Sequence, residues 1–199
     1  MSTLALDIEV FHGFFYHGIK RLSDGERFGF EMSSEYPLFP CKRVRTILEK
    51  NRIVTFNGTG YDLPLLWYVI AGADNAMVKK ASDAIIRNRI RWWQVEDCLE
   101  IRIPKTIDHI DLIEPQPSAF ASLKTLNGRL HGNRLQDLPY DFDITPDARQ
   151  RAKLRHYCLH SDMDATDNLW NALAEAIALR EALGAEFAEI VAGLSRQFG

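Results

Sequence analysis

Cysteine is scarce in this chain, and its spacing excludes two kinds of site. Cys41, Cys98 and Cys158 are the only cysteines among 199 residues, an odd number at wide separations. A zinc site would need closely spaced pairs and a disulfide framework would need an even set, so neither fits. We therefore expect free thiols in a reducing compartment, the cytoplasm.

Long apolar runs and a strong excess of charge are also missing. The most apolar stretch, YDLPLLWYVIAGA, is shorter than a membrane span and contains Asp62 and Pro64. The first ten residues lack the basic lead and apolar core of a secretion signal. A net charge of −3 argues against a strongly basic binder, although carboxylates gathered at one site can coexist with basic patches elsewhere. We expect no membrane partner.

The bulk composition is that of a folded domain. Hydrophobic residues make up 46% and charged residues 26% of the chain, which excludes global disorder and allows a full core. The chain has no internal repeat and no low-complexity segment. We expect a single domain over residues 1–199, with a helical extension from about residue 171.

Alternation of apolar and polar residues predicts an N-terminal sheet. Residues 4–10 alternate with a period of two, which is typical of a strand. Residues 13–22 and 26–33 flank Ser23-Asp24-Gly25, a hairpin signal in which Asp-Gly supplies the turn. Short β-rich runs predict further strands at residues 53–56 and 109–113.

Helical patterns alternate with these later strands. We expect helices at 41–51, at 62–70, across 74–100 and from Thr145-Pro146-Asp147 to the end, with Pro146 in the first helical position and a break at Gly184. Residues 118–143 are mixed and rich in loops. Strands that alternate with helices after an N-terminal hairpin indicate a mixed α/β fold.

Acidic residues in two segments can share one site. Asp7 and Glu9 are two apart on a strand, so their side chains point to the same face, and Ala5 leaves room beside them. Repulsion between adjacent carboxylates is relieved by a divalent cation. Asp62 ends FNGTGYD at the start of a helix, where Asn57 can steady the loop or touch a substrate. Taken singly, the first pair is typical of solvated surface and Asp62 of a helix cap.

A third acidic segment, HYCLHSDMDAT, lies near the C-terminal end. Asp162 is the candidate ligand, because an aromatic hydroxyl, Tyr157, comes shortly before it. For Asp164 and Asp167 we expect the ordinary role of a charged run, a solvated helix face.

In this order, LALDIEV, TFNGTGYD and HYCLHSDMDAT resemble the three motifs of the DEDD superfamily of 3′–5′ exonucleases. The nearest resemblance is to the proofreading domains of phage and family A or B DNA polymerases. IDHIDLIEP and SLKTLNGRLHG also resemble the segment between the second and third motifs, so the similarity covers residues 3 to 170 or thereabouts. It implies a ribonuclease-H-like fold, a mixed sheet of antiparallel hairpin strands and parallel strands flanked by helices.

The third motif departs from the pattern of the family. In the tyrosine branch the aspartate lies four positions after the tyrosine. Here Asp162 lies five positions after Tyr157, which is the spacing of the histidine branch. Five steps on an ideal helix place the two side chains about 140° apart. Either the helix begins after Tyr157, or His156 or His160 takes its role. Asp164 with His160 is a further alternative.

The resemblance implies a two-metal hydrolysis of nucleic acid. Two Mg²⁺ or Mn²⁺ ions would be bound by Asp7, Glu9, Asp62 and Asp162, with Tyr157 orienting the attacking water. The expected substrate is the end of single-stranded DNA, and the expected product is a nucleoside 5′-monophosphate. A phage-type proofreading or processing nuclease, acting beside a separate polymerase or replication protein in the host cytoplasm, is the leading hypothesis. An exoribonuclease and a non-catalytic binding module are the alternatives.

Several residues are candidates for holding the substrate. Basic residues next to aromatic ones suit a single strand, since phosphates pair with cations and bases stack on rings. One basic cluster comprises Lys42, Arg43, Arg45, Lys50 and Arg52; a second comprises Lys79, Lys80, Arg87, Arg89 and Arg91, and runs into Trp92-Trp93. From these we select Arg89 and Arg91, and we add Phe11, Asn57 and Tyr61 near the first two motifs. The alternative is a solvated helix with the tryptophans in the core.

Overall fold

Five strands form one mixed sheet in the computed structural model of the protein, which describes residues 1–115, 121–132 and 136–198. The strands are β1 (Thr3–Phe11), β2 (Phe14–Arg21), β3 (Arg27–Ser33), β4 (Arg52–Thr55) and β5 (His109–Asp111). Their order is β3-β2-β1-β4-β5. The first three pair antiparallel, whereas β4 pairs parallel with β1 and with β5. The predicted α/β class with a mixed sheet is therefore confirmed.

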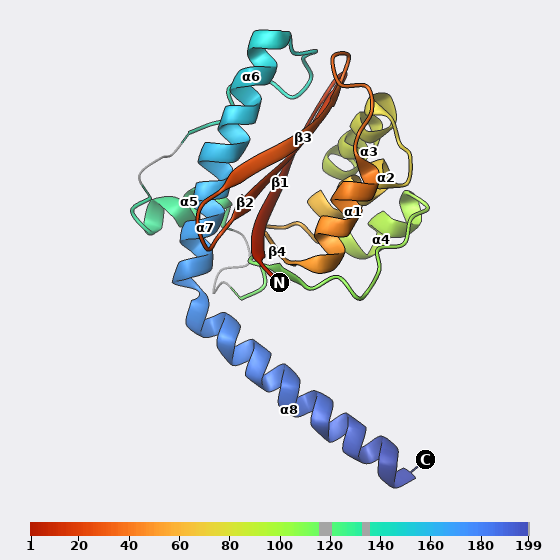
Figure 1. Cartoon of the computed structure of the whole chain (residues 1–199), viewed down its shortest axis with the longest axis vertical. Coiled ribbons are helices and arrows are strands. Elements are labelled where there is room, and N and C mark those ends of the chain that lie inside the picture. The colour runs from red at the N-terminus through yellow and green to blue at the C-terminus, as the bar shows by residue number, and fades with distance from the viewer. Residues whose placement is uncertain (116–120, 133–135, 199) are drawn as a thin grey trace.

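Helices cover both faces of this sheet (Figure 1). They are α1 (Cys41–Lys50), α2 (Asp62–Ile70), α3 (Asn75–Arg87), α4 (Trp92–Cys98), α5 (Leu123–Arg129), α6 (Ala148–Tyr157), α7 (Met163–Ala172) and α8 (Ala174–Phe198), with a π-helical turn at Cys158–Asp162. Helices α1 to α4 lie on one side, and α5 to α7 lie on the other. The last helix, α8, extends away from the rest of the molecule.

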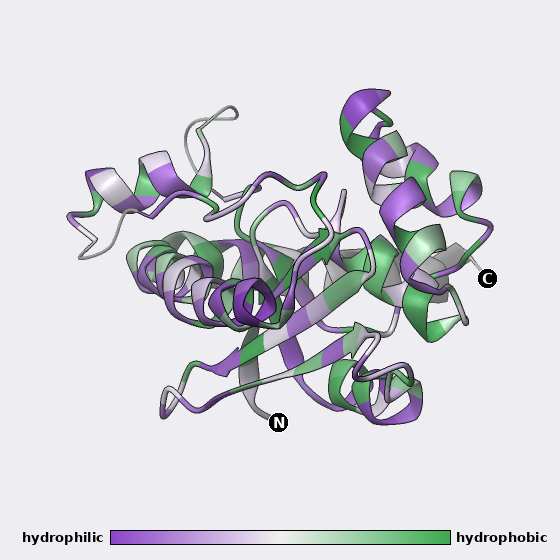
Figure 2. Ribbon diagram, turned by 90° about the horizontal axis from the view of Figure 1, so that it is seen from above, coloured by the Kyte–Doolittle hydropathy of each residue, from purple (hydrophilic) through white to green (hydrophobic). Residues whose placement is uncertain are grey.

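The alternation along β1 divides the core in two. Leu4, Leu6 and Ile8 pack in the cluster that includes residues of α1, α2 and α3. Ala5 and Phe11 pack on the opposite face, with residues of α6 and α7. Figure 2 shows hydrophilic and hydrophobic residues interleaved along the helices, as helices that cover a sheet require. Asp7 and Glu9 therefore face the side of the sheet covered by α6 and α7.

Two helix boundaries differ from the predicted ones. The predicted helix over 74–100 is two helices, because the chain turns between Asn88 and Arg91, where Arg89 has φ 51°. This turn lets Ile90 and Val95 pack against the core that α3 also covers. The predicted break at Gly184 is wrong, since α8 continues through it. Glycine costs a helix only about 1 kcal/mol relative to alanine, too little to end it among strong helix formers.

Smaller differences concern the start of α6 and the last strand. Asp147 is the N-cap of α6 and accepts a hydrogen bond from the Gln150 N–H at 2.8 Å, so Pro146 precedes the cap and does not occupy the first helical position. Strand β5 ends at Asp111, two residues before the predicted end. Within the loop-rich region 118–143, residues 118–120 and 133–135 lie outside the described residues. Among the described residues, no helix combines the length and apolarity of a membrane span.

Candidate metal centre

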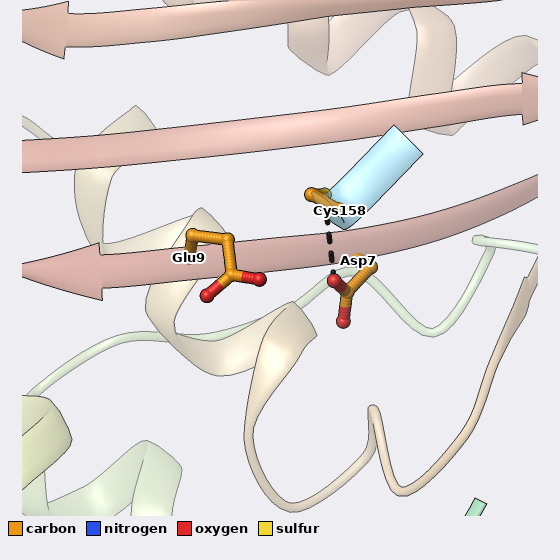
Figure 3. A group of neighbouring side chains, drawn as sticks. All are labelled: Asp7, Glu9 and Cys158. Carbon is orange, nitrogen blue, oxygen red and sulfur yellow. Dashed lines mark hydrogen bonds between the residues drawn. The ribbon is translucent and has the colours of Figure 1, made fainter. Parts of the chain in front are cut away.

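Asp7 and Glu9 project from the same side of β1, as the two-residue spacing predicts (Figure 3). They border a cavity of about 300 Å³. The lining residues are Asp7, Ile8, Glu9, Val10, Phe11, Tyr61, Ile86, Leu138, Phe142, Tyr157 and Asp162. All three predicted acidic segments therefore contribute to one cavity: the first through Asp7 and Glu9, the second through Tyr61, and the third through Tyr157 and Asp162.

Asp62 is fixed to β1 by a backbone hydrogen bond. On one edge β1 pairs with β4, but only from Thr3 to Ala5. Among the described residues no strand lies beside this edge of β1 after Ala5. The Ile8 N–H, between Asp7 and Glu9, donates to the Asp62 Oδ1 at 3.2 Å. Asp62 begins α2 and is buried. The end of β4 thus makes room for the second acidic segment directly beside the first.

Asp111, at the end of β5, holds the loop that leads to Asp62. Its carboxylate accepts hydrogen bonds from the backbone N–H of Asn57 at 2.7 Å and of Thr59 at 2.9 Å. Asn57 has φ 62°, a left-handed conformation that asparagine tolerates better than most residues. The predicted role of Asn57 in steadying the loop therefore belongs to its backbone, and the anchoring side chain is Asp111.

The irregular spacing of the third motif is accommodated by a π-helical turn. Residues Cys158–Asp162 form this turn, and the Met163 N–H donates to the Cys158 carbonyl, five residues earlier. In such a turn residues five apart lie above one another, whereas in an α-helix they would not. Tyr157 and Asp162 accordingly share a side-chain hydrogen bond. The proposed start of the helix after Tyr157 is wrong, because Tyr157 is the last residue of α6.

The two histidines that were alternatives to Tyr157 lie away from the cavity. His156 is exposed, and the His160 ring contacts Arg27, with 3.1 Å between Nδ1 and Nη1. Their rings lie 4.4 Å apart. Neither is among the described residues that line the cavity. Of the three candidates, Tyr157 is the one that borders it.

The surroundings of the four acids disfavour the ionised form of each carboxyl group. Burial raises the pKa of Asp7 and Glu9 well above the ordinary values, and the charges of Asp162 and Asp62 raise both further. Burial, followed by the charge of Asp111, raises the pKa of Asp62 to about 7. Burial raises the pKa of Asp162 to about 6, although the hydrogen bond from Tyr157 acts in the opposite direction. Each acid is thus held where an added positive charge would stabilise its ionised form.

Cys158 is a neighbour of the centre that the sequence patterns did not reveal. Its thiol donates to the Asp7 Oδ2 at 3.4 Å, as Figure 3 shows. Asp7, Glu9 and Cys158 offer ligand atoms within 4.8 Å of one another, the one such group of three found among the described residues. Asp62 and Asp162 lie outside this tight group and are linked to it by the hydrogen bond to Ile8 and by charge.

The close approach of Cys158 depends on a glycine in β2. Gly18 is the cross-strand partner of Asp7, so a side chain there would point to the same face. A Cβ atom at Gly18 would lie 2.6 Å from the Cys158 Sγ and 3.3 Å from Leu159 and Met163. The glycine therefore leaves the space in which the π-helical turn rests against the sheet.

Lys124 is a second residue that the sequence interpretation missed. It belongs to α5, and its Nζ lies 5.7 Å from the centre of the Tyr157 ring. Its positive charge lowers the pKa of Glu9 and of Asp162. The signal was present, since Lys124 lies in SLKTLNGRLHG, the segment that resembles polymerase exonucleases.

Asp164 and Asp167 are not the solvated face that the sequence predicted. Lys20 on β2 is buried, and its Nζ pairs with Asp164 at 2.7 Å and with Asp167 at 2.6 Å. Arg27 pairs with Asp164 as well, at 2.6 Å. These ion pairs tie α7 to the sheet, and neither Asp164 nor His160 is among the described residues that line the cavity.

The predicted substrate contacts are divided between the cavity and its surroundings. Phe11 and Tyr61 line the cavity, and the hydroxyl groups of Tyr61 and Ser82 share a hydrogen bond of 2.7 Å. Arg89 and Arg91 are exposed in the connection between α3 and α4, and they do not belong to the described cavity lining. Lys79, in the same basic cluster, is buried and pairs with Asp83 and Asp143, so its role is structural.

No family model matches the chain, and no curated protein and no solved structure matches it significantly.

Proposed function

We propose that this protein is a metal-dependent 3′–5′ exonuclease that releases nucleoside 5′-monophosphates from the ends of single-stranded DNA. One observation carries the proposal: three acids from two distant segments line one cavity with a fourth acid beside them, and none of the four forms a salt bridge within the described part of the chain. Asp7, Glu9 and Asp162 line the cavity, and Asp62 is bonded to the strand between the first two. Unneutralised buried carboxylates are costly to maintain, and a functional site is the usual reason for them.

The fold supports this proposal. An antiparallel β1-β2-β3 unit, followed by parallel β4 and β5, agrees with the ribonuclease-H-like arrangement that the motif resemblance implies. The π-helical turn also gives a structural reason for the irregular spacing, the feature that favoured a non-catalytic binding module. Because Tyr157 reaches Asp162 through it, the five-residue spacing is compatible with a working third motif.

The donor set fits hard divalent cations. Glu9 is 7% exposed, and no hydrogen bond to its carboxylate occurs among the described residues. Carboxylate oxygens are the ligands that Mg²⁺ and Mn²⁺ prefer, so Asp7, Glu9, Asp62 and Asp162 are the residues that would hold two such ions. When bound, these ions supply Lewis-acid chemistry, which lowers the pKa of a water and stabilises a leaving oxygen.

The remaining side chains have roles that follow from their positions. The Tyr157 hydroxyl, already at Asp162, can orient a water beside that carboxylate. Lys124 brings the positive charge that a phosphodiester requires in an acidic cavity. Tyr61 provides ring surface in the cavity wall for a terminal base, whereas Phe11 is buried in the core behind that wall. The Ile8 N–H keeps the Asp62 carboxylate aligned with β1.

The substrate and the setting are further parts of the proposal. Single-stranded DNA, a separate polymerase or replication protein and a cytoplasmic site of action follow from the resemblance to proofreading domains. RNA is the competing substrate, since the metal chemistry makes no use of the 2′-hydroxyl. Matched strands of DNA and RNA in one assay distinguish the two.

The test is Asp7→Ala with an exposed-acid control, Glu49→Gln; Glu49 pairs with Arg45 on α1. With a 5′-labelled strand and Mg²⁺, the wild type and E49Q should produce a descending ladder that a chelator abolishes. Asp7→Ala should produce none while keeping the circular dichroism spectrum of the wild type. Undiminished trimming by Asp7→Ala, or trimming in chelator, would refute the proposal.

A further inference from the structure

A second pocket lies against the loop that leads to Asp62. It has a volume of about 520 Å³. Its lining residues are Thr59, Leu63, Trp92, Trp93, Glu96, Asp97, Arg102, Ile103, Pro104, Lys105, Ile107 and His109. We call it the tryptophan pocket, after Trp92 and Trp93 at the start of α4. A volume of this size is in the range of sites that take small molecules or parts of larger ligands.

Both tryptophans expose most of their surface. Trp92 is 60% exposed and Trp93 is 59% exposed, so the alternative in which they anchor the core is wrong. Their rings stand nearly perpendicular, at 89°, with centres 5.6 Å apart. Large aromatic side chains are seldom left in water, and two adjacent ones in a pocket wall indicate a ligand with an aromatic face or edge.

The tryptophan pocket shares a wall with the carboxylate cavity. Tyr61 lines the cavity, whereas Thr59 and Leu63, on either side of it in the chain, line the pocket. Trp92 reaches this same loop, since a Cβ atom at Gly60 would lie 3.4 Å from the Trp92 Cβ. A strand whose end lies in the cavity can therefore continue across this loop into the pocket.

The rim of the pocket carries charges of both signs. Arg102, which pairs with Asp97, and Lys105 line it. Exposed Arg89 and Arg91 precede Trp92, and they and Lys105 are available for a phosphate backbone. Glu96 also lines the pocket, and carboxylates accept hydrogen bonds from the amino groups of bases. Rings for stacking, beside cations for phosphates, are the combination that holds single strands.

We infer that the tryptophan pocket binds a nucleobase of the single strand, upstream of the nucleotide that is removed. This inference rests on the proposed function and names a second subsite for its substrate. A base is favoured over a protein side chain as the occupant because the pocket adjoins the cavity and cations precede it. The strand is thereby held at two places, its terminal nucleotide at the carboxylates and an earlier base at the tryptophans.

The test compares affinities for oligothymidylates of one to six nucleotides, in chelator so that no hydrolysis occurs. The wild type should bind more tightly as the length increases from one to a few nucleotides, with quenching of tryptophan fluorescence. The double variant Trp92→Ala/Trp93→Ala should lose roughly 5- to 150-fold affinity for the longer strands, the range expected for one stacked base. Its affinity for thymidine monophosphate should be unchanged.

Two controls accompany this variant. Tyr36→Ala removes an aromatic ring that is 55% exposed and lines a different pocket, and it should leave all affinities as in the wild type. Trp92→Phe/Trp93→Phe keeps the rings and should restore most of the affinity. Thermal unfolding confirms that each variant is folded at the temperature used.

The outcomes separate this inference from the proposed function. Length-dependent binding that persists in Trp92→Ala/Trp93→Ala, or a wild type that binds no oligonucleotide, overturns the subsite. The same strands are then incubated with Mg²⁺. Hydrolysis with tryptophan-independent binding overturns the subsite alone, whereas tryptophan-dependent binding without hydrolysis overturns the nuclease proposal alone.

Discussion

Asp162 and Asp164 are two residues apart, yet their charged surroundings differ. Lys20 and Arg27 both pair with Asp164, whereas the side-chain partner of Asp162 is the neutral Tyr157 hydroxyl. Burial raises the pKa of Asp162 to about 6. Burial also raises the pKa of Asp164, but the hydrogen bonds from Arg27 and Lys20 outweigh it, so the pKa of Asp164 lies below its ordinary value.

The difference separates structural acids from acids that are available to a ligand. Asp164 is neutralised by the chain itself, and its charge attaches α7 to β2 and β3. Asp162 faces the cavity with Asp7 and Glu9, where neighbouring negative charge accumulates. Closely spaced acids in this segment thus fall into two groups, those paired with cations of the chain and those that face the cavity. Which group an acid belongs to depends on whether a cation on a neighbouring element reaches it.

Neutralising each acid in turn tests the difference between them most directly. Asp162→Asn should lower the rate of Mg²⁺-dependent hydrolysis by roughly 10³-fold or more, equivalent to about 4 kcal/mol of barrier, because a proposed metal ligand is lost. Asp164→Asn should change the rate by less than about 10-fold. It should instead lower the free energy of unfolding by about 1–3 kcal/mol, because Lys20 and Arg27 lose a partner.

Single-turnover rates and urea unfolding of both variants measure these effects. A rate in Asp162→Asn close to that of the wild type, or a loss of hydrolysis in Asp164→Asn as large as in Asp162→Asn, would contradict the division into two classes. The asparagine variants keep the volume of the side chain, so packing is matched.

A second, smaller contrast concerns the lysines that accompany the two acids. Lys124 pairs with Asp137, whose side chain is fully in solvent, and its charge acts on Glu9 and Asp162. Lys124→Met should reduce hydrolysis by roughly 10- to 100-fold, because an electrostatic donor near the reacting phosphate is removed. The free energy of unfolding should change by less than about 1 kcal/mol.

The matched variant is Lys20→Met, which leaves Asp164 and Asp167 without their buried cation. It should destabilise the protein by about 1–3 kcal/mol. Rates measured well below the unfolding temperature should stay within a few-fold of the wild type. If Lys124→Met unfolds the protein, or Lys20→Met abolishes hydrolysis in the folded state, the assignment of the two lysines is wrong.

The smallest expected effects are in the pH dependence of stability without metal. The pKa of Asp162 is raised to about 6 and that of Asp62 to about 7, so the stability linked to each is present below pH about 4 and is lost as the pH rises to these values. Asp164 has a lowered pKa, so its contribution is present above pH about 4 and is lost as the pH falls.

Melting temperatures in chelator, measured from pH 3 to pH 8, test these opposite signs. Relative to the wild type, Asp162→Asn should be a few degrees more stable at pH 7.5 and no more stable at pH 4. Asp164→Asn should be less stable at pH 7.5, with a difference that shrinks toward pH 3. Mg²⁺ should raise the melting temperature of the wild type at pH 7.5. Equal pH profiles for the two variants would contradict the pKa assignments.

Local patterns were sufficient for the first two acidic segments. The period of two in residues 4–10 predicts both β1 and the common face of Asp7 and Glu9. The glycine-rich loop followed by an apolar run predicts α2 and the place of Asp62 at its first residue. These predictions succeed because each depends on residues a few positions apart.

The third segment depended on contacts that no local pattern contains. A π-helical turn has no strong sequence signal, and here it lies where Cys158 meets Asp7 and a glycine of β2. The pairing of Lys20 with Asp164 joins residues 144 positions apart. Asp111 was seen only as part of a strand, because its bonds to the loop at Asn57 require β4 and β5 to be adjacent.

Gly18 shows how a residue with no functional group can shape a cluster of acids. A methyl group at this position would lie too close to the Cys158 sulfur, so Cys158, in the turn that bears Asp162, would have to shift. Any search for essential positions by chemical type would pass over it, since glycine has nothing to ionise or coordinate. The contact between the first and third acidic segments thus depends on an empty space in the middle of the sheet, and a substitution there would disturb the contact of Cys158 with Asp7 without altering any of the four carboxylates.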